Sequence, residues 1–210
     1  MRSGLAARLR SETSDLHAAA ERSPFMAELL AGRLDRDAYA ALLANLLVIY
    51  EALEPALARH ASHPAIALLD CAALARTPAL RADLASLGTR ATAPTQASAA
   101  RYAGRIEELG ATRPEPLVAH AYVRYLGDLS GGQMLRRVVA RSTNLGAGVG
   151  TAFYDFGDDA EVAARAQRFR EGLDVAPIVD LEVVVAEAKL AFEWHCTLFD
   201  ELAVATGVPR

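Results

Sequence analysis

Hydrophobic residues recur along most of the chain at spacings of three and four, which is the period of an amphipathic helix. Near the N-terminus this stripe consists of Leu5, Leu9, Leu16 and Ala20. It predicts a helix from about Ser3 to Ser23, which Pro24 ends. The same pattern predicts further helices over residues 25–31, 36–60, 95–109, 159–172 and 178–205, and two short ones between residues 61 and 93.

The composition agrees with one folded domain spanning residues 1–210. Hydrophobic residues make up 52% of the chain, enough for a substantial core, and strand-forming residues are sparse before residue 175. A run over residues 183–185 would suit a strand, but the helical pattern on both sides outweighs it. We therefore expect an all-α, single-domain helical bundle.

Charge and cysteine content limit the classes of partner and of cellular compartment that the sequence suggests. The net charge is −4 and the pI is about 5.8, so the chain lacks the basic excess typical of nucleic-acid-binding proteins. Cys71 and Cys196 form no CxxC motif and no metal-ligand spacing, which favours a reducing, cytoplasmic setting. No stretch reaches the ~20 apolar residues that span a bilayer. We expect neither a nucleic-acid partner nor a membrane anchor.

A predicted helix that follows Pro116 and runs to about Ser142 contains Gly127, Gly131 and Gly132. Each glycine costs up to ~1 kcal/mol relative to alanine inside a helix, so this cluster suggests that bare backbone is needed there. Gly127 and Gly131 are four apart and share one face, against which a flat ligand could press. Taken alone, the glycines fit a tight helix crossing or a helix break as well as they fit a ligand-binding face.

The first predicted helix carries a candidate metal ligand, His17. Glu21 lies one turn later on the same face, and Arg10 lies two turns earlier. A metal-bound histidine usually has its other ring nitrogen held by a carboxylate, a carbonyl or water, and Glu21 could take that role. A lone helical histidine is more often a surface or core residue. Combined with a bare glycine face elsewhere, however, His17 predicts a slot for a planar metal macrocycle ligated on one side.

The residues around these positions carry a family resemblance. The chain resembles the heme oxygenases in the proximal segment at residues 13–17 with Glu21 and residues 24–26, the second long helix at 49–54, the distal signature at 117–133, and the last helix at 188–192 and 198–202. The likeness covers about residues 9–202. The distal signature, LVAHAYVRYLGDLSGGQ, is long and specific.

The resemblance implies a helical bundle in which heme b is sandwiched between a proximal helix and a kinked distal helix. It implies that His17 ligates the iron and that Glu21 holds its second ring nitrogen. It also places Asp128, Arg124 and Tyr50 in a polar network that orders distal water. The other implied site residues are the glycines Gly127, Gly131 and Gly132, the propionate contacts Arg10, Tyr122 and Arg170, and the aromatic lining Phe192 and Phe199.

The resemblance further implies an activity. A heme oxygenase cleaves heme, its cofactor and substrate, to biliverdin, CO and free ferrous iron, with O2 and with electrons from a separate reductase or ferredoxin. The alternatives are a non-catalytic heme carrier or sensor on the same fold, and an all-α protein without a cofactor. Storage needs no distal proton network, so Asp128 and Arg124 argue against the carrier.

Two positions depart from the family pattern. Ala166 stands where a second basic propionate contact is common, one turn before Arg170, and leaves Arg165 or Arg168 as substitutes. His195 stands where some relatives carry asparagine near the distal waters. It either tunes the polar network or fills space with a hydrogen bond.

Overall fold

The computed structural model describes residues 4–88, 94–142 and 149–209, and these residues form helices and turns without a strand. The α-helices are α1 (Leu5–Glu21), α2 (Pro24–Leu30), α3 (Arg36–Arg59), α4 (Thr77–Ser86), α5 (Ala97–Thr112), α6 (Leu117–Ala121), α7 (Gly127–Ser142), α8 (Asp159–Val175) and α9 (Leu181–Thr206). Shorter turns are η1 (Cys71–Leu74), η2 (Tyr122–Leu126) and η3 (Ala152–Tyr154). The expected all-α fold is confirmed; Ser3, the expected first helical residue, lies outside the described residues.

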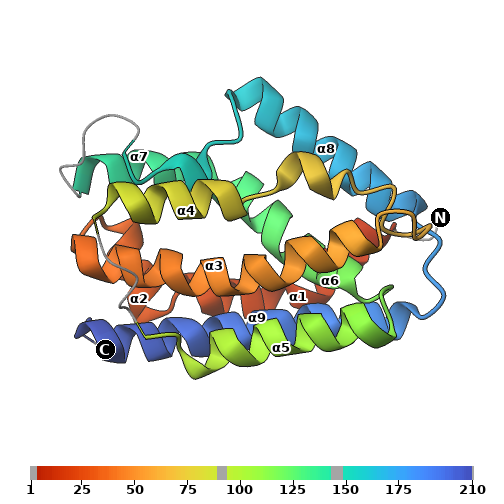
Figure 1. The fold of residues 1–210 in the computed structure, drawn as a ribbon, viewed down its shortest axis with the longest axis horizontal. Helices are drawn as coiled ribbons and strands as arrows, with labels where there is room; N and C mark the ends of the chain where they lie inside the picture. The colour runs from red at the N-terminus through yellow and green to blue at the C-terminus, as the bar shows by residue number, and fades with distance from the viewer. Residues whose placement is uncertain (1–3, 89–93, 143–148, 210) are drawn as a thin grey trace.

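The long helices pack in layers along the longest axis of the molecule. α3 packs against both α4 and α5, and α9 packs against α1, α5 and α6. In Figure 1, α4, α7 and α8 lie along the upper side of the view, α3 runs through the middle with α1 behind it, and α5 and α9 lie below. The first and last helices of the chain, α1 and α9, are thereby packed against each other.

Local signals account for the helix ends. The Asp35 side chain accepts a hydrogen bond from the backbone of Ala38 at 2.7 Å and starts α3. Asp158 and Glu161 form a reciprocal capping box at the start of α8. Gly207 adopts the left-handed conformation (φ 70°) that ends α9.

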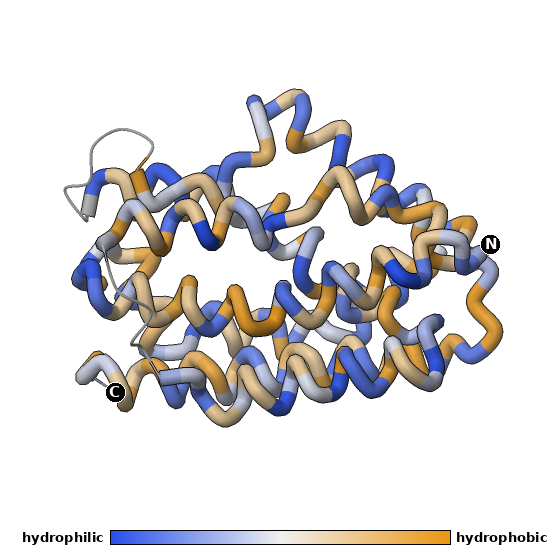
Figure 2. Tube along the Cα trace, in the orientation of Figure 1, coloured by the Kyte–Doolittle hydropathy of each residue, from blue (hydrophilic) through white to orange (hydrophobic). Residues whose placement is uncertain are grey.

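The long apolar helix α3 lies in the core. Leu43, Ile49 and Leu53 are fully buried. By length and composition this helix could cross a membrane, but 67% of its most apolar window is buried inside the protein, as expected for a core helix. Hydrophobic and hydrophilic positions alternate along most of the helices in Figure 2, which is the pattern of helices that bury one face.

The helix expected over 95–109 is longer than the sequence suggested. α5 continues past Gly110 to Thr112. A Cβ atom added at Gly110 would lie 3.1 Å from the Cβ atom of Ala56 on α3. This glycine therefore allows the two helices to pack closely instead of ending one of them. α3 likewise continues through Pro55.

The glycine-bearing segment is a continuous helix with one irregular turn. α6 leads directly into the π turn η2, which ends at Leu126, and α7 begins at Gly127. Gly127 itself has ordinary right-handed helical angles (φ −60°, ψ −50°). The irregularity expected at the glycines thus lies one turn before them. The backbone conformation at position 127 does not require glycine. What glycine provides there is the absence of a side chain.

Candidate functional site

His17 lies on an open part of the surface of α1. Half of its side chain (50%) is exposed, and its Nδ1 atom lies 3.6 Å from an Oε atom of Glu21. The two side chains thus meet on one face of α1, as their spacing predicted, with Nδ1 turned towards Glu21. Within the described residues, His17 and Glu21 belong to no cluster of three or more histidine, cysteine or acidic side chains.

The glycine face of α7 is bare, as predicted. A Cβ atom added at Gly127 would meet no atom within 4 Å, and one added at Gly131 would meet only the side chain of Leu135 at 4.0 Å. Gly132 differs, because a Cβ atom there would lie 3.5 Å from the backbone oxygen of Tyr154. Gly127 and Gly131 therefore open the face to a ligand, whereas Gly132 is buried against η3.

Contacts on either side of His17 join α1 and α2 to the glycine-bearing segment. On α1, Thr13 lies against the hydroxyl of Tyr122 in η2, one turn before His17 and one widened turn before Gly127. Further along the chain, α2 packs against α7. These contacts bring α1, which carries His17, alongside η2, and α2 alongside α7, which carries the bare glycines. We call the region between α1 and the start of α7 the slot. This arrangement fits a flat ligand with a metal at its centre.

A buried polar cluster lies next to the glycine face. The hydroxyl of Tyr50 donates to one carboxylate oxygen of Asp128, and Nη2 of Arg124 donates to the other at 2.8 Å. Asp128 is only 8% exposed. The Arg124 guanidinium also lies over the Tyr50 ring, 5.3 Å from its centroid. The three residues expected to form a polar network are therefore in direct contact.

The electrostatics of the cluster keep the Tyr50 phenol protonated and the Arg124 guanidinium charged, and they raise the pKa of Asp128. Burial raises the pKa of the Asp128 carboxyl, and the charge of Arg124 and the hydroxyl of Tyr50 oppose that shift. Burial raises the pKa of Tyr50 well above its ordinary range, so the phenol stays protonated and donates. Burial lowers the pKa of Arg124, but nearby Asp128 reverses the shift and keeps the guanidinium charged.

Basic side chains gather at one edge of the slot. Burial raises the pKa of the Tyr122 hydroxyl, whereas Thr13 and the charges of Arg10 and Arg170 oppose the shift. Arg10 and Arg170 are exposed and come from α1 and α8. Arg165, a suggested substitute at the Ala166 position, donates instead to the backbone oxygen of Ala73 at 2.9 Å. Arg10, Tyr122 and Arg170, the three predicted propionate contacts, therefore lie close to one another.

The two aromatic residues expected on the distal side occupy different places. The Phe192 ring lies edge-on to the His17 ring, with centroids 5.7 Å apart. The Phe199 ring stacks on Phe25 and also lies edge-on to His195. Phe192 therefore borders the candidate metal ligand, while only Phe199 lies beside a residue bonded to the polar cluster. Residues of one helix, α9, thus contact both His17 and the polar cluster.

The sequence did not predict two buried contacts between helices. His195 accepts from Arg124, 71 positions away in the chain. His120 lies with Nε2 3.3 Å from Glu187 on α9, and Glu187 is also paired with Arg105. No local signal reveals these pairs, because their members lie on different helices. His120 is fully buried and lies beside Glu187, which indicates a structural role.

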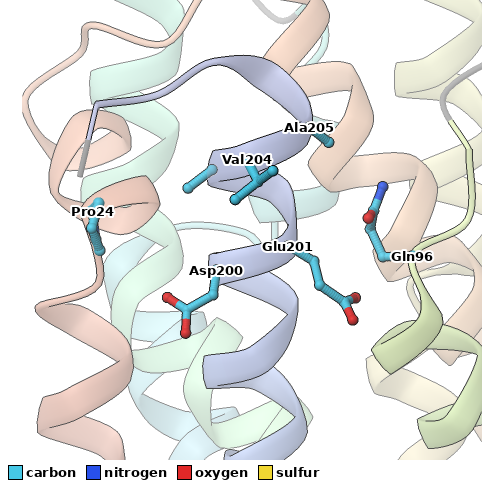
Figure 3. A pocket seen from close by; sticks show the side chains of 7 residues that line it. Pro24, Gln96, Asp200, Glu201, Val204 and Ala205 are labelled. Atoms are coloured by element: carbon cyan, nitrogen blue, oxygen red, sulfur yellow. The ribbon is translucent and has the colours of Figure 1, made fainter.

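A separate surface hollow of about 670 Å³ lies near the C-terminal end of α9 (Figure 3). None of the predicted site residues lines it. Its Glu201 already accepts hydrogen bonds from the backbone and hydroxyl of Ser98, and the backbone of Gln96 donates to Asn45. The residues there are engaged in holding the start of α5, so the chemistry points to the slot between α1 and α7.

Comparison with known proteins agrees with this geometry. The family model described as heme oxygenase matches residues 3–201. Heme oxygenase 1 of Nostoc sp. is 38% identical over 96% of this chain and 87% of its own length. The crystal structure of heme oxygenase-1 from Synechocystis sp. in complex with heme has a TM-score of 0.88 at 35% identity, covering 98% of this chain and 97% of that one. Heme oxygenase-2 from Synechocystis sp., solved with heme and NO, has a TM-score of 0.90 at 33% identity, covering 96% and 86%.

Proposed function

Because this chain belongs to the heme oxygenase family, we propose that the slot between α1 and α7 is where it binds and degrades heme. The reaction is the oxidative cleavage of heme to biliverdin, CO and free ferrous iron. The observation that carries the assignment to this slot is the pairing of an exposed histidine with a bare glycine face. A side chain at Gly127 or Gly131 would occupy the space that a flat ring needs.

His17 is the residue that would hold the iron. Glu21 lies on the Nδ1 side of the imidazole, so Nε2 would be the metal ligand and Glu21 would hold the other ring nitrogen. Phe192 packs edge-on against the ring and restricts its rotation. Heme, when bound, supplies the iron that activates O2 and the ring carbon that is oxidised.

Asp128, Arg124 and Tyr50 would manage protons on the opposite side. Asp128 follows Gly127 directly, and both of its oxygens already accept hydrogen bonds from Tyr50 and Arg124. A carboxylate held in this way is oriented and can pass a proton through an ordered water without itself touching the reacting atoms. The bare glycines keep other side chains from the same space.

The basic edge would fix the orientation of heme within the slot. Arg10 and Arg170 carry positive charges close to the Tyr122 hydroxyl, and they complement the two propionates of heme. Electrons would come from a separate reductase or ferredoxin, and O2 would enter from solvent. A heme carrier is the less favoured candidate, because binding alone does not need the buried Tyr50–Asp128–Arg124 cluster.

Heme titration followed by reduction tests the proposal. The purified protein is titrated with heme and then given O2 and a reductant; loss of the Soret band and growth of bilin absorption are expected. His17→Ala should change the heme spectrum and abolish turnover, whereas His63→Ala, at a turn outside the slot, should leave both unchanged. A His17→Ala protein with wild-type spectrum and bilin yield would remove His17 from its role. Stable heme binding by the wild type without bilin formation would favour the carrier.

A further inference from the structure

His195 on α9 is buried beside Arg124 and is bonded at both ring nitrogens. It is 5% exposed. Its Nδ1 atom lies 3.0 Å from the backbone oxygen of Ala191, one turn earlier on the same helix. Its Nε2 atom is hydrogen-bonded to Nη1 of Arg124. The imidazole thus connects the backbone of α9 to the polar cluster of η2 and α7.

The two partners determine where the proton of His195 lies. A backbone carbonyl can only accept, so Nδ1 carries the hydrogen. A guanidinium can only donate, so Nε2 is unprotonated and accepts from Arg124. Burial and the adjacent positive charge lower the pKa of His195 to about 3, which agrees with a neutral ring.

Two side chains hold the terminal nitrogens of the Arg124 guanidinium, and His195 is one of them. Nη2 binds Asp128 and Nη1 binds His195, while Nε has no protein partner in the described residues. A planar guanidinium held at both terminal nitrogens has a fixed orientation, whereas one held only by Asp128 can pivot about that bond. Asp128 depends in turn on Arg124 for one of its two hydrogen bonds.

The rings around His195 prevent it from turning away. Tyr102 and Phe199 both lie edge-on to the imidazole, with centroids at 5.4 Å and 5.9 Å. The hydrogen bond to Ala191 adds a third restraint. His195 is therefore held as rigidly as the residue that it orients.

We propose that His195 is a positioning residue, which holds Arg124 so that the Asp128 carboxylate faces the slot. The role rests on the proposed function, because positioning matters only if Asp128 serves the heme reaction. Of the two roles considered for His195 from the sequence, this proposal favours tuning the polar network and not filling space. The residue acts through Arg124 and does not touch the ligand.

Side-chain length separates this role from simple packing. The amide of glutamine reaches the place of Nε2, whereas the shorter amide of asparagine reaches only the place of Nδ1. His195→Gln should therefore keep an acceptor for Arg124. His195→Asn and His195→Leu should not, although asparagine remains polar and leucine remains bulky.

The first test uses the protein without heme. Nitrogen NMR of protein labelled in histidine, with His195→Gln to assign the signals, should show His195 protonated at Nδ1 and unprotonated at Nε2 between pH 5 and pH 8. A signal for a ring protonated at Nε2, or one that titrates in this range, would overturn the proposal. This measurement does not depend on turnover.

The second test compares the three variants with heme. Heme affinity should stay within about threefold of wild type in all three, because His195 does not touch the slot. The turnover number should be near wild type in His195→Gln and lower by roughly ten- to hundredfold in His195→Asn and His195→Leu, the range for losing a buried hydrogen bond to a charged group. If His195→Leu fails to fold, the pair of amide variants decides. Equal rates in His195→Gln and His195→Asn would overturn the positioning role while wild-type bilin formation upholds the proposed function. A wild type that forms no bilin would overturn both.

Discussion

Replacing Gly127 with alanine should stabilise the heme-free protein and weaken its hold on heme. Gly127 has helical angles, and a Cβ atom there meets nothing within 4 Å, so the new methyl group causes neither strain nor a clash. Alanine in place of glycine within a helix stabilises by roughly 0.5–1 kcal/mol. For a chain of this size that gain corresponds to a rise in melting temperature of roughly 1–4 °C.

The same methyl group occupies the space that we assign to heme. Carbon atoms approach to about 3.5–4.0 Å at best, so a ring in contact with the bare backbone must move away from a new Cβ atom. Overpacking of this kind costs roughly 1–3 kcal/mol, which is about a five- to hundredfold loss of heme affinity. Gly127→Ala should thus move stability and affinity in opposite directions.

Thermal unfolding without heme and optical heme titration measure the two effects. Gly104→Ala is the matched control, because Gly104 is an exposed glycine inside α5 whose added Cβ atom also meets nothing within 4 Å. It should show a similar gain in stability with unchanged heme affinity. The reasoning is refuted if Gly127→Ala binds heme as the wild type does, or if it lowers the melting temperature.

Three further changes probe other parts of the structure. Gly172→Ala would place a Cβ atom 2.1 Å from the backbone oxygen of Leu68, so denaturant unfolding should show a loss of roughly 1–3 kcal/mol, and a loss below 0.5 kcal/mol would contradict this packing. Asp128→Asn leaves the buried charge of Arg124 without its partner, so the free energy of unfolding should fall by roughly 3 kcal/mol and bilin formation should be suppressed; wild-type bilin yield would disprove the assigned role. Burial raises the pKa of Glu187, but hydrogen bonds from His120 and Arg105 outweigh this effect. Together they lower the pKa from 4.5 to about 2. Its contribution to stability is therefore complete above about pH 4.5 and is lost as the pH falls toward 2, so unfolding curves of Glu187→Gln across this range should depend less on pH than those of the wild type.

The helices and the contacts within them followed from local spacing. The caps at Asp35 and Asp158 could be read directly, because a cap involves residues only three apart. His17 with Glu21, and Arg124 with Asp128, are four apart, so the helical period alone places each pair on one face. The bare face of Gly127 and Gly131 is predictable for the same reason.

Contacts between helices depended on how those helices cross, which no local pattern encodes. Tyr50 meets Asp128 across 78 positions, and His195 meets Arg124 across 71. The place of Phe192 beside His17 likewise depends on how α9 packs against α1. A helix period shows which residues share a face, but the neighbour of that face is set by packing of the whole core. For this reason the sequence identified the chemical groups of the site, whereas contacts such as His195 with Arg124 and Phe192 with His17 were decided by the packing of the helices.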